Sequence, residues 1–156
     1  MHEYSAWDDE RAGEIITPWC TAEGGTLPAL HALMAEFGAV PDAAVPLLAQ
    51  QFNLSRAEIR GIISFYHDFR RTPPGRHVLK LCRAEACQSM HGATLAENLL
   101  ARLGLTWGAT TTDGALTIEP VYCLGLCAVA PAALFDEVPQ GRLDVARLDR
   151  LVAATR

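Results

Sequence analysis

The chain has 156 residues, enough for one domain or two small ones; 50% of them are hydrophobic and 20% are charged. This composition supports a buried core and excludes a disordered chain. The formal net charge is −5 and no lysine and arginine cluster stands out, which argues against nucleic acid as the main partner. The acidic first ten residues do not resemble a secretory signal, and no stretch approaches the roughly 20 apolar residues of a membrane helix. We therefore expect a cytoplasmic protein with reduced cysteines.

The first 72 residues predict a small helical bundle. Apolar residues recur at helical spacing over residues 8–16, 26–37 and 43–52, and again from residue 55 onward. Pro28 suits the first turn of the second helix and Gly38 suits its end. Ser55 and Glu58 have the spacing of a capping box, so we expect the fourth helix to begin there. Its apolar stripe starts at Ile59 and continues to Tyr66 or Phe69.

Residues 64–71 carry three aromatic residues and two arginines at the end of this bundle. We interpret them as the C-terminus of the fourth helix, where cations interact favourably with the helix dipole. A partner surface is the alternative, because aromatic residues and arginine are common in interfaces. The Thr-Pro-Pro-Gly run at residues 72–75 then breaks the chain, and we place a boundary between domains 1–72 and 73–156 there.

The second domain predicts a small α/β fold. A strand over residues 77–82 ends on Cys82, and Cys87 begins a loop that runs through residues 88–92. A helix is expected over 93–103, a threonine-rich turn over 108–114 and a second strand over 115–122. Strands at 132–138 and 141–144 are expected to form a hairpin that turns at 139–141, and a helix over 145–154 closes the chain. This order predicts a sheet covered by helices.

Four of the five cysteines form two pairs, Cys82-x4-Cys87 and Cys123-x3-Cys127, separated by 35 residues. Each pair follows a predicted strand, which is where α/β sheets place their sites. Four thiolates, two on each iron, are what a [2Fe–2S] cluster requires. Gly125 would allow a close approach of backbone N–H groups to sulfur, and Gly92 is a second candidate for that role.

Other sites with sulfur ligands remain open. Structural zinc also takes four thiolates, with a usual spacing of about two to four residues within a pair. The Cys82-x4-Cys87 pair fits only at the limit of this range, and the chain has no C-x2-C pair. A thioredoxin-type redox pair needs C-x-x-C, which is absent, and a Rieske centre needs two histidines. The histidines are interpreted as structural or exposed; they are His2, His31, His67, His77 and His91. We interpret Cys20 as a small buried residue and Arg83 as either a tuning charge beside the cluster or an exposed loop side chain.

Several further motifs resemble one family across nearly the whole chain. They are Ser64-Phe-Tyr-His-Asp-Phe69, Pro74-Gly-Arg-His77, Cys82-x4-Cys87 followed by Gly92, Thr111-Thr-Asp-Gly114, and Cys123-Leu-Gly-Leu-Cys127 with Ala130-Pro131 after it. The chain resembles the thioredoxin-like [2Fe–2S] subunits of NADH-linked oxidoreductases. This family includes the 24 kDa subunit of respiratory complex I, the small diaphorase subunit of NAD-reducing hydrogenases and the gamma subunit of NAD-dependent formate dehydrogenases.

The resemblance implies a thioredoxin-like [2Fe–2S] domain preceded by a helical bundle that docks on the flavin- and NADH-binding subunit. Cys82 and Cys87 would hold one iron, and Cys123 and Cys127 the other. FMN, NAD and a molybdenum cofactor would reside on partner subunits, and no catalytic site is expected on this chain, which has no G-x-G-x-x-G motif.

The compact length and residues 88–91 and 127–131 are most similar to the formate dehydrogenase gamma subunit. The positions after Cys127 are small and apolar, whereas the family usually has a polar or charged residue among them. An equivalent subunit of complex I or of an NAD-reducing hydrogenase is the alternative. A zinc-stabilised interaction module is the rival from a different functional class.

Overall fold

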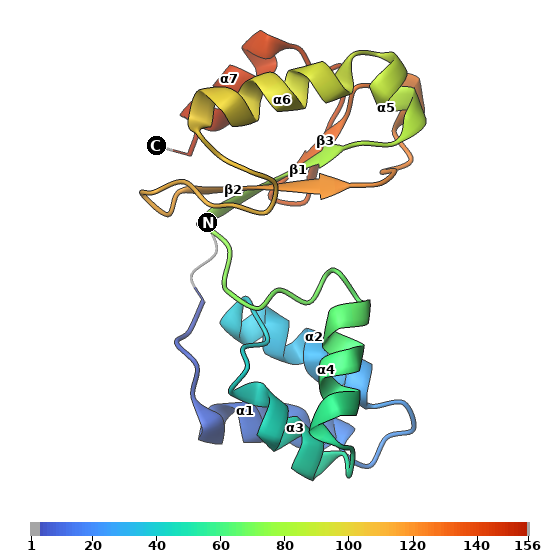
Figure 1. The fold of residues 1–156 in the computed structure, drawn as a ribbon, viewed down its shortest axis with the longest axis vertical. Helices are drawn as coiled ribbons and strands as arrows, with labels where there is room; N and C mark the ends of the chain where they lie inside the picture. Colours follow the sequence, from blue (N-terminus) through green and yellow to red (C-terminus); the bar gives the residue numbers. More distant parts are fainter. Residues whose placement is uncertain (1–3, 156) are drawn as a thin grey trace. The chain divides into compact units, whose positions relative to one another are not determined.

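The computed structural model describes residues 4–155, and these form two compact units, residues 4–73 and residues 74–155 (Figure 1). Each unit has its own hydrophobic core. Within residues 4–155, no helix is long and apolar enough to cross a membrane. His2 lies outside the described residues.

The first unit is helical, as predicted. Its elements are α1 (Asp9–Ile16), the 3-10 turn η1 (Thr17–Trp19), α2 (Thr26–Phe37), α3 (Ala44–Gln51) and α4 (Arg56–Phe65). Its core consists of residues that the helical periodicity places inward, including Ile16, Leu30, Leu33, Leu48 and Ile59. Burial of such aliphatic side chains contributes about 1.5–3 kcal/mol each, so this core is the main source of stability of the unit.

Local signals set the helix ends where the sequence predicts them. Gly38 has a φ of 68°, which favours glycine, and it ends α2. At the start of α4, the Glu58 N–H donates to the Ser55 hydroxyl at 3.1 Å, and the Ser55 N–H donates to the Glu58 carboxylate at 2.7 Å. This reciprocal pair is the predicted capping box.

The end of α4 differs from the prediction. The helix stops at Phe65, and Tyr66 is extended, so the arginines at 70 and 71 are not part of a helical C-terminus. The cause is tertiary: Phe69 is 6% exposed in the core, 5.0 Å from the ring of His31, and the carbonyl of Arg70 accepts the Val40 N–H at 2.8 Å. The Phe69 N–H donates to the carbonyl of Tyr66 at 3.1 Å, so these contacts hold a turn where the local pattern predicts a helix.

Cys20 is partly buried and packs against the helical core. Its thiol donates to the carbonyl of Ile16 at 3.4 Å. This agrees with its interpretation as a small buried residue.

The second unit is built on a four-stranded mixed sheet. Its elements are β1 (His77–Cys82), α5 (Glu85–Ser89), α6 (Gly92–Leu103), β2 (Leu116–Val121), η2 (Cys127–Val129), β3 (Ala133–Phe135), β4 (Val138–Gln140) and α7 (Val145–Ala153). The strand order is β2-β1-β3-β4, with β1 and β2 parallel and the other pairs antiparallel. Helices α6 and α7 lie side by side on one face of the sheet (Figure 1).

Alternation along β1 separates the helix-covered face from the other face. Leu79 and Leu81 are buried in the core that includes Leu99 of α6 and Leu148 of α7. Because successive side chains of a strand point to opposite faces, Cys82 points away from this core, and it is buried in a separate small cluster.

The hairpin is shifted from the prediction. It turns at Asp136 and Glu137, with φ of 48° and 65°, rather than at residues 139–141, which the prediction assigned to the turn. Pro139 instead lies in β4, where it pairs with Leu134. A proline is tolerated there because β4 is at the edge of the sheet and its missing N–H removes no ladder bond on the outer side.

The Asp136 carboxylate links this turn to β1. It accepts the Val78 N–H at 2.9 Å and lies 2.6 Å from Nδ1 of His77. Burial opposes its ionisation, but the hydrogen bonds from His77 and Val78 outweigh burial, and the pKa of Asp136 lies below its usual value. The charged carboxylate therefore stabilises the fold above the unfolded-state pKa, and this stabilisation is lost as pH falls through the lower, folded-state pKa.

We expect Asp136→Asn to lower the free energy of unfolding by about 1–3 kcal/mol at neutral pH, because the buried charge-assisted hydrogen bonds are weakened. The difference between the two proteins should shrink as pH falls below about 5 and vanish only below the lowered folded-state pKa of Asp136, where the native carboxylate is protonated. Urea denaturation across pH provides the measurement. Parallel curves for the two proteins would contradict the role given to Asp136.

Candidate metal centre

The parallel pairing of β1 and β2 brings the two cysteine motifs to one edge of the sheet. Cys82, the last residue of β1, is in register with Val121, the last residue of β2, and Cys123 follows two residues later. The ladder continues past the strands, because the Arg83 N–H donates to the carbonyl of Val121 at 2.8 Å. The predicted placement of both motifs after strand ends is confirmed.

Cys87 lies on a short helix, where the sequence pattern predicts the beginning of a loop. The carbonyl of Ala84 accepts the N–H groups of Cys87 and Gln88, both at 3.0 Å, which starts the helical turn of α5. The Gln88 side chain then donates to the carbonyl of Arg83 at 2.6 Å. These bonds close the segment between the two cysteines on itself, so local backbone geometry positions Cys87 relative to Cys82.

The second motif forms an exposed turn. Cys123 has a φ of 76° and Gly125 a φ of 73°, and Cys127 begins η2. No protein atom lies within 4 Å of a Cβ built on Gly125, so its left-handed backbone, rather than crowding by protein atoms, accounts for glycine there. Cys123 and Cys127 are exposed, whereas Cys82 and Cys87 are buried.

The environment of the buried pair favours a thiolate on Cys82. Burial opposes ionisation of Cys82, but hydrogen bonds from the Ala84 N–H, the Cys87 thiol and the N–H groups of Cys123 and Leu124 lower its pKa. Burial and the hydrogen bond to Cys82 raise the pKa of Cys87, and the charges of Cys82 and Cys127 act in the same direction. The loops at 84–87 and 123–127 therefore already interact through these sulfur atoms.

The residues at this edge fit a two-iron cluster. All five cysteines are free. Among residues 4–155, no three His, Cys, Asp or Glu side chains are grouped as a metal site, and this holds for the four cysteines as well, so the fit rests on the chemistry of the four thiols. A [2Fe–2S] cluster takes its thiolates in pairs, one pair on each iron. Backbone N–H groups directed at Cys82 supply the hydrogen bonds to sulfur that such a cluster needs.

Comparison with known proteins gives the family. The model of the thioredoxin-like [2Fe–2S] ferredoxin family matches residues 12–156. The chain belongs to this family. Its members carry one [2Fe–2S] cluster.

Relatives of the chain are subunits of NADH-linked enzymes. A subunit of the NADH-quinone oxidoreductase of Pseudomonas aeruginosa is 31% identical over 140 residues, which cover 90% of this chain and 77% of that protein. A subunit of the same enzyme from Rhizobium meliloti is 35% identical, covering 83% and 77%. In the crystal structure of an NAD+-reducing [NiFe]-hydrogenase in the H2-reduced state, a chain is 34% identical with a TM-score of 0.70. That match covers 84% of this chain and 22% of the hydrogenase chain.

Gly92 is required by close packing in this member of the family. A Cβ at Gly92 would lie 2.6 Å from the carbonyl oxygen of Cys87. The first turn of α6 therefore rests on the backbone of the cysteine-bearing helix. The close neighbour of Gly92 is thus the Cys87 backbone, and the predicted approach of a Gly92 N–H group to sulfur stays a prediction.

The described histidines are structural or exposed, as predicted. His91 is exposed at the start of α6 with a φ of 63°, and His67 is exposed. His31 packs against Phe69, and His77 pairs with Asp136.

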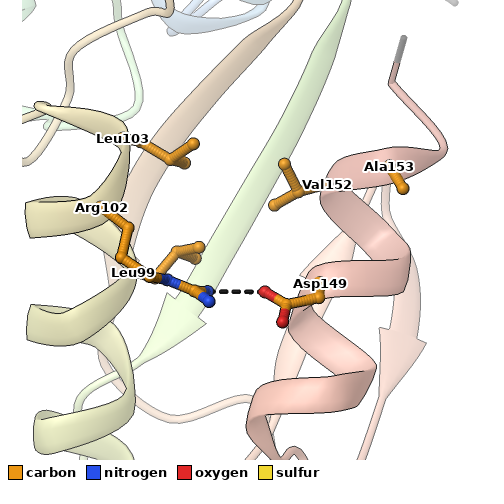
Figure 2. Close-up of a pocket in the computed structure, with 6 residues that line it drawn as sticks. All are labelled: Leu99, Arg102, Leu103, Asp149, Val152 and Ala153. Atoms are coloured by element: carbon orange, nitrogen blue, oxygen red, sulfur yellow. Dashed lines mark hydrogen bonds and ion pairs between the residues drawn. The ribbon is translucent and has the colours of Figure 1, made fainter.

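A pocket of about 270 Å³ lies between α6 and α7, away from the cysteines. Figure 2 shows Arg102 and Asp149 pointing toward one another across it, 2.6 Å apart, among Leu99, Leu103, Val152 and Ala153. Its residues come from the last turns of α6 and from α7, whereas the first residue of α6, Gly92, packs on the Cys87 backbone. The ion pair is about half exposed, and such pairs contribute little to stability.

Sequence reasoning missed Trp107 and the short helix α5. The guanidinium of Arg83 lies over the ring of Trp107, 5.0 Å from its centroid. This excludes the interpretation of Arg83 as a simply solvent-facing side chain. No local pattern marks Trp107, because it is 24 residues from Arg83 in the chain.

We expect Gly92→Ala to destabilise the protein by about 1–3 kcal/mol, because the new methyl group forces the Cys87 backbone or α6 to move. The matched control is Gly13→Ala in α1, where nothing lies within 4 Å of the added Cβ. That substitution should stabilise the protein by about 0.5–1 kcal/mol. Chemical denaturation of both variants is the measurement, and equal effects would refute the packing argument.

Proposed function

We propose that this chain is an electron-transfer subunit with one [2Fe–2S] cluster, working in an NADH-linked oxidoreductase complex. Cys82 and Cys87 bind one iron, and Cys123 and Cys127 bind the other. The observation that carries this proposal is the convergence of the two cysteine pairs at one sheet edge, with backbone N–H groups directed at Cys82. The names of the relatives support the assignment to NADH-linked complexes.

The exposure of the cysteines supports exchange of single electrons with a partner. Cys123 and Cys127 are exposed, and the neighbouring Tyr122 is 70% exposed. The buried pair, Cys82 and Cys87, holds the other side of the cluster inside the protein. The cluster thus has one side near the surface, where a partner's redox group can approach. Substrate chemistry takes place on partner subunits, which carry FMN, NAD and a molybdenum cofactor.

We assign the complex to the cytoplasmic NAD-dependent formate dehydrogenases, with this chain as the gamma subunit. Residues 88–91 and 127–131 support this assignment. A second candidate is the equivalent subunit of respiratory complex I or of an NAD-reducing hydrogenase. It is favoured by the relatives, which are named as subunits of NADH-quinone oxidoreductase and as an NAD+-reducing hydrogenase.

The helical unit supplies the docking surface for the flavin- and NADH-binding subunit. Phe65 is 73% exposed and Tyr66 is 42% exposed. They line a shallow groove of about 440 Å³ together with residues of α4 and Leu54. Exposed aromatic side chains beside an apolar groove are typical of protein interfaces.

We expect anaerobically purified protein to contain about two irons and two sulfides per chain and to give an EPR signal after reduction by dithionite. Cys123→Ser and Cys82→Ser should each lose or perturb the cluster. Cys20→Ser is the control and should keep it, because Cys20 packs in the other unit. Zinc without sulfide would instead establish a structural zinc site, and a normal signal in Cys123→Ser would remove this residue from the ligands.

We expect Phe65→Asp to weaken binding of the partner complex at least about tenfold, while iron and sulfide contents stay normal. Val138→Asp is the control, since Val138 is 57% exposed on the edge strand of the other unit. The tagged chain is purified from its host with its partners, which are assayed for formate:NAD+, NADH:quinone and H2:NAD+ activity. Formate:NAD+ activity would support the gamma-subunit assignment. NADH:quinone or H2:NAD+ activity would instead assign the chain to complex I or to an NAD-reducing hydrogenase.

A further inference from the structure

Arg83 connects the cysteine-bearing segment to the helix-covered side of the sheet. Leu79 and Leu81 face the core under α6 and α7, and the alternation of the chain directs Arg83 to the same side. Its guanidinium lies over the ring of Trp107, which is partly buried against that core. Cys82, one residue earlier, points to the other face. A cation held on Trp107 thus lies on the opposite face of the sheet from Cys82, on the next residue of the chain.

The backbone of Arg83 is held on both sides. Its N–H donates to the carbonyl of Val121 at 2.8 Å, and its own carbonyl accepts from the Gln88 side chain at 2.6 Å. The other half of the contact is also anchored, because the N–H of Gly108, next to Trp107, donates to the carbonyl of Ile118 at 2.8 Å. The backbone of Arg83 is therefore held by β2, and its guanidinium is held by the Trp107 ring.

This arrangement matters for an electron carrier because reduction changes charge. One electron enters the cluster, and the negative charge of the cluster and its four thiolates increases by one. Arg83 directly follows Cys82 in the chain, so its charge is carried by a side chain that starts beside the cysteine and ends on the opposite face of the sheet. A cation on a partly buried ring is screened less than one in bulk water, so its attraction for the added electron is larger.

We propose that Arg83, held in place by Trp107, is a positioning residue that raises the reduction potential of the cluster. This inference rests on the proposed function. Trp107 acts through Arg83: its ring gives the strongest cation–π contact among the aromatic side chains, and it keeps the charge beside the sheet edge. The charge is the acting property, and the ring fixes its location.

The experiment is an EPR-monitored redox titration of the full-length chain with its cluster reconstituted. Arg83→Gln should lower the midpoint potential relative to the native protein. Arg83→Lys, which keeps the charge but loses the planar stacking, should fall between the two. Trp107→Leu should lower the potential part of the way because the guanidinium moves into solvent, and Trp107→Phe should stay close to native.

Arg102→Gln is the matched control. This substitution also removes one positive charge. Arg102 lies on the last turn of α6, away from the cysteines, and pairs with Asp149 of α7, so its loss should leave the reduction potential unchanged. The proposal is overturned if Arg83→Gln has the native potential or the same potential as Arg102→Gln. It is also overturned if Arg83→Lys and Arg83→Gln shift equally, since the charge would then have no part.

These outcomes are distinguishable from failure of the proposed function. Iron and sulfide analysis and the EPR signal of the native chain come first. If the cluster is present and Arg83→Gln leaves its potential unchanged, the electron-carrier function stands and only the role of Arg83 is lost. If the native chain contains no cluster, both fail.

Discussion

The parallel pairing of β1 with β2 is the constraint on which the cysteine site depends. Parallel strands need a crossover connection, and here α6 supplies it between the two motifs. Because both strands then run in the same direction, their carboxyl ends meet at one edge. The register that aligns Cys82 with Val121 brings together two cysteine pairs that are separated by 35 residues. A slip of one residue would turn Cys82 toward the helix-covered core.

The second consequence of this pairing is an unequal environment for the two cysteine pairs. The first pair is buried, and N–H groups of its own loop and of the loop at 123–127 are directed at Cys82. The second pair lies on an exposed turn. A buried side protects a cluster from water and strengthens its hydrogen bonds, whereas an exposed side lets a partner approach closely. Both properties are useful to a carrier of single electrons.

Contacts between several segments, both near and far in the chain, hold this edge together. The carbonyl of Ala132 accepts the Cys82 N–H at 3.0 Å, so the chain leading into β3 supports the first motif directly. Gly92 lets the start of α6 rest on the Cys87 backbone, and Trp107 anchors the arginine that follows Cys82. The sheet and the segments at its edge therefore position both the cysteines that we propose as ligands and the residues around them.

The sequence by itself determined those features that depend on neighbouring residues. The capping box at Ser55 and Glu58, the glycine that ends α2 and the strand that ends on Cys82 all follow from local hydrogen bonding, backbone conformation or periodicity. The spacing of the cysteines and their positions after predicted strands were enough to indicate an iron–sulfur site. These predictions succeed because short-range chemistry decides the outcome at those positions.

Only the tertiary structure decided the features that depend on distant partners. The hairpin turns at Asp136 because its carboxylate bonds to β1, and α4 stops at Phe65 because Phe69 inserts into the core. The stacking of Arg83 on Trp107 and the burial of one cysteine pair also require segments far apart in the chain to meet. No local pattern carries this information, since the free energy of these contacts arises only when the core of each unit has formed.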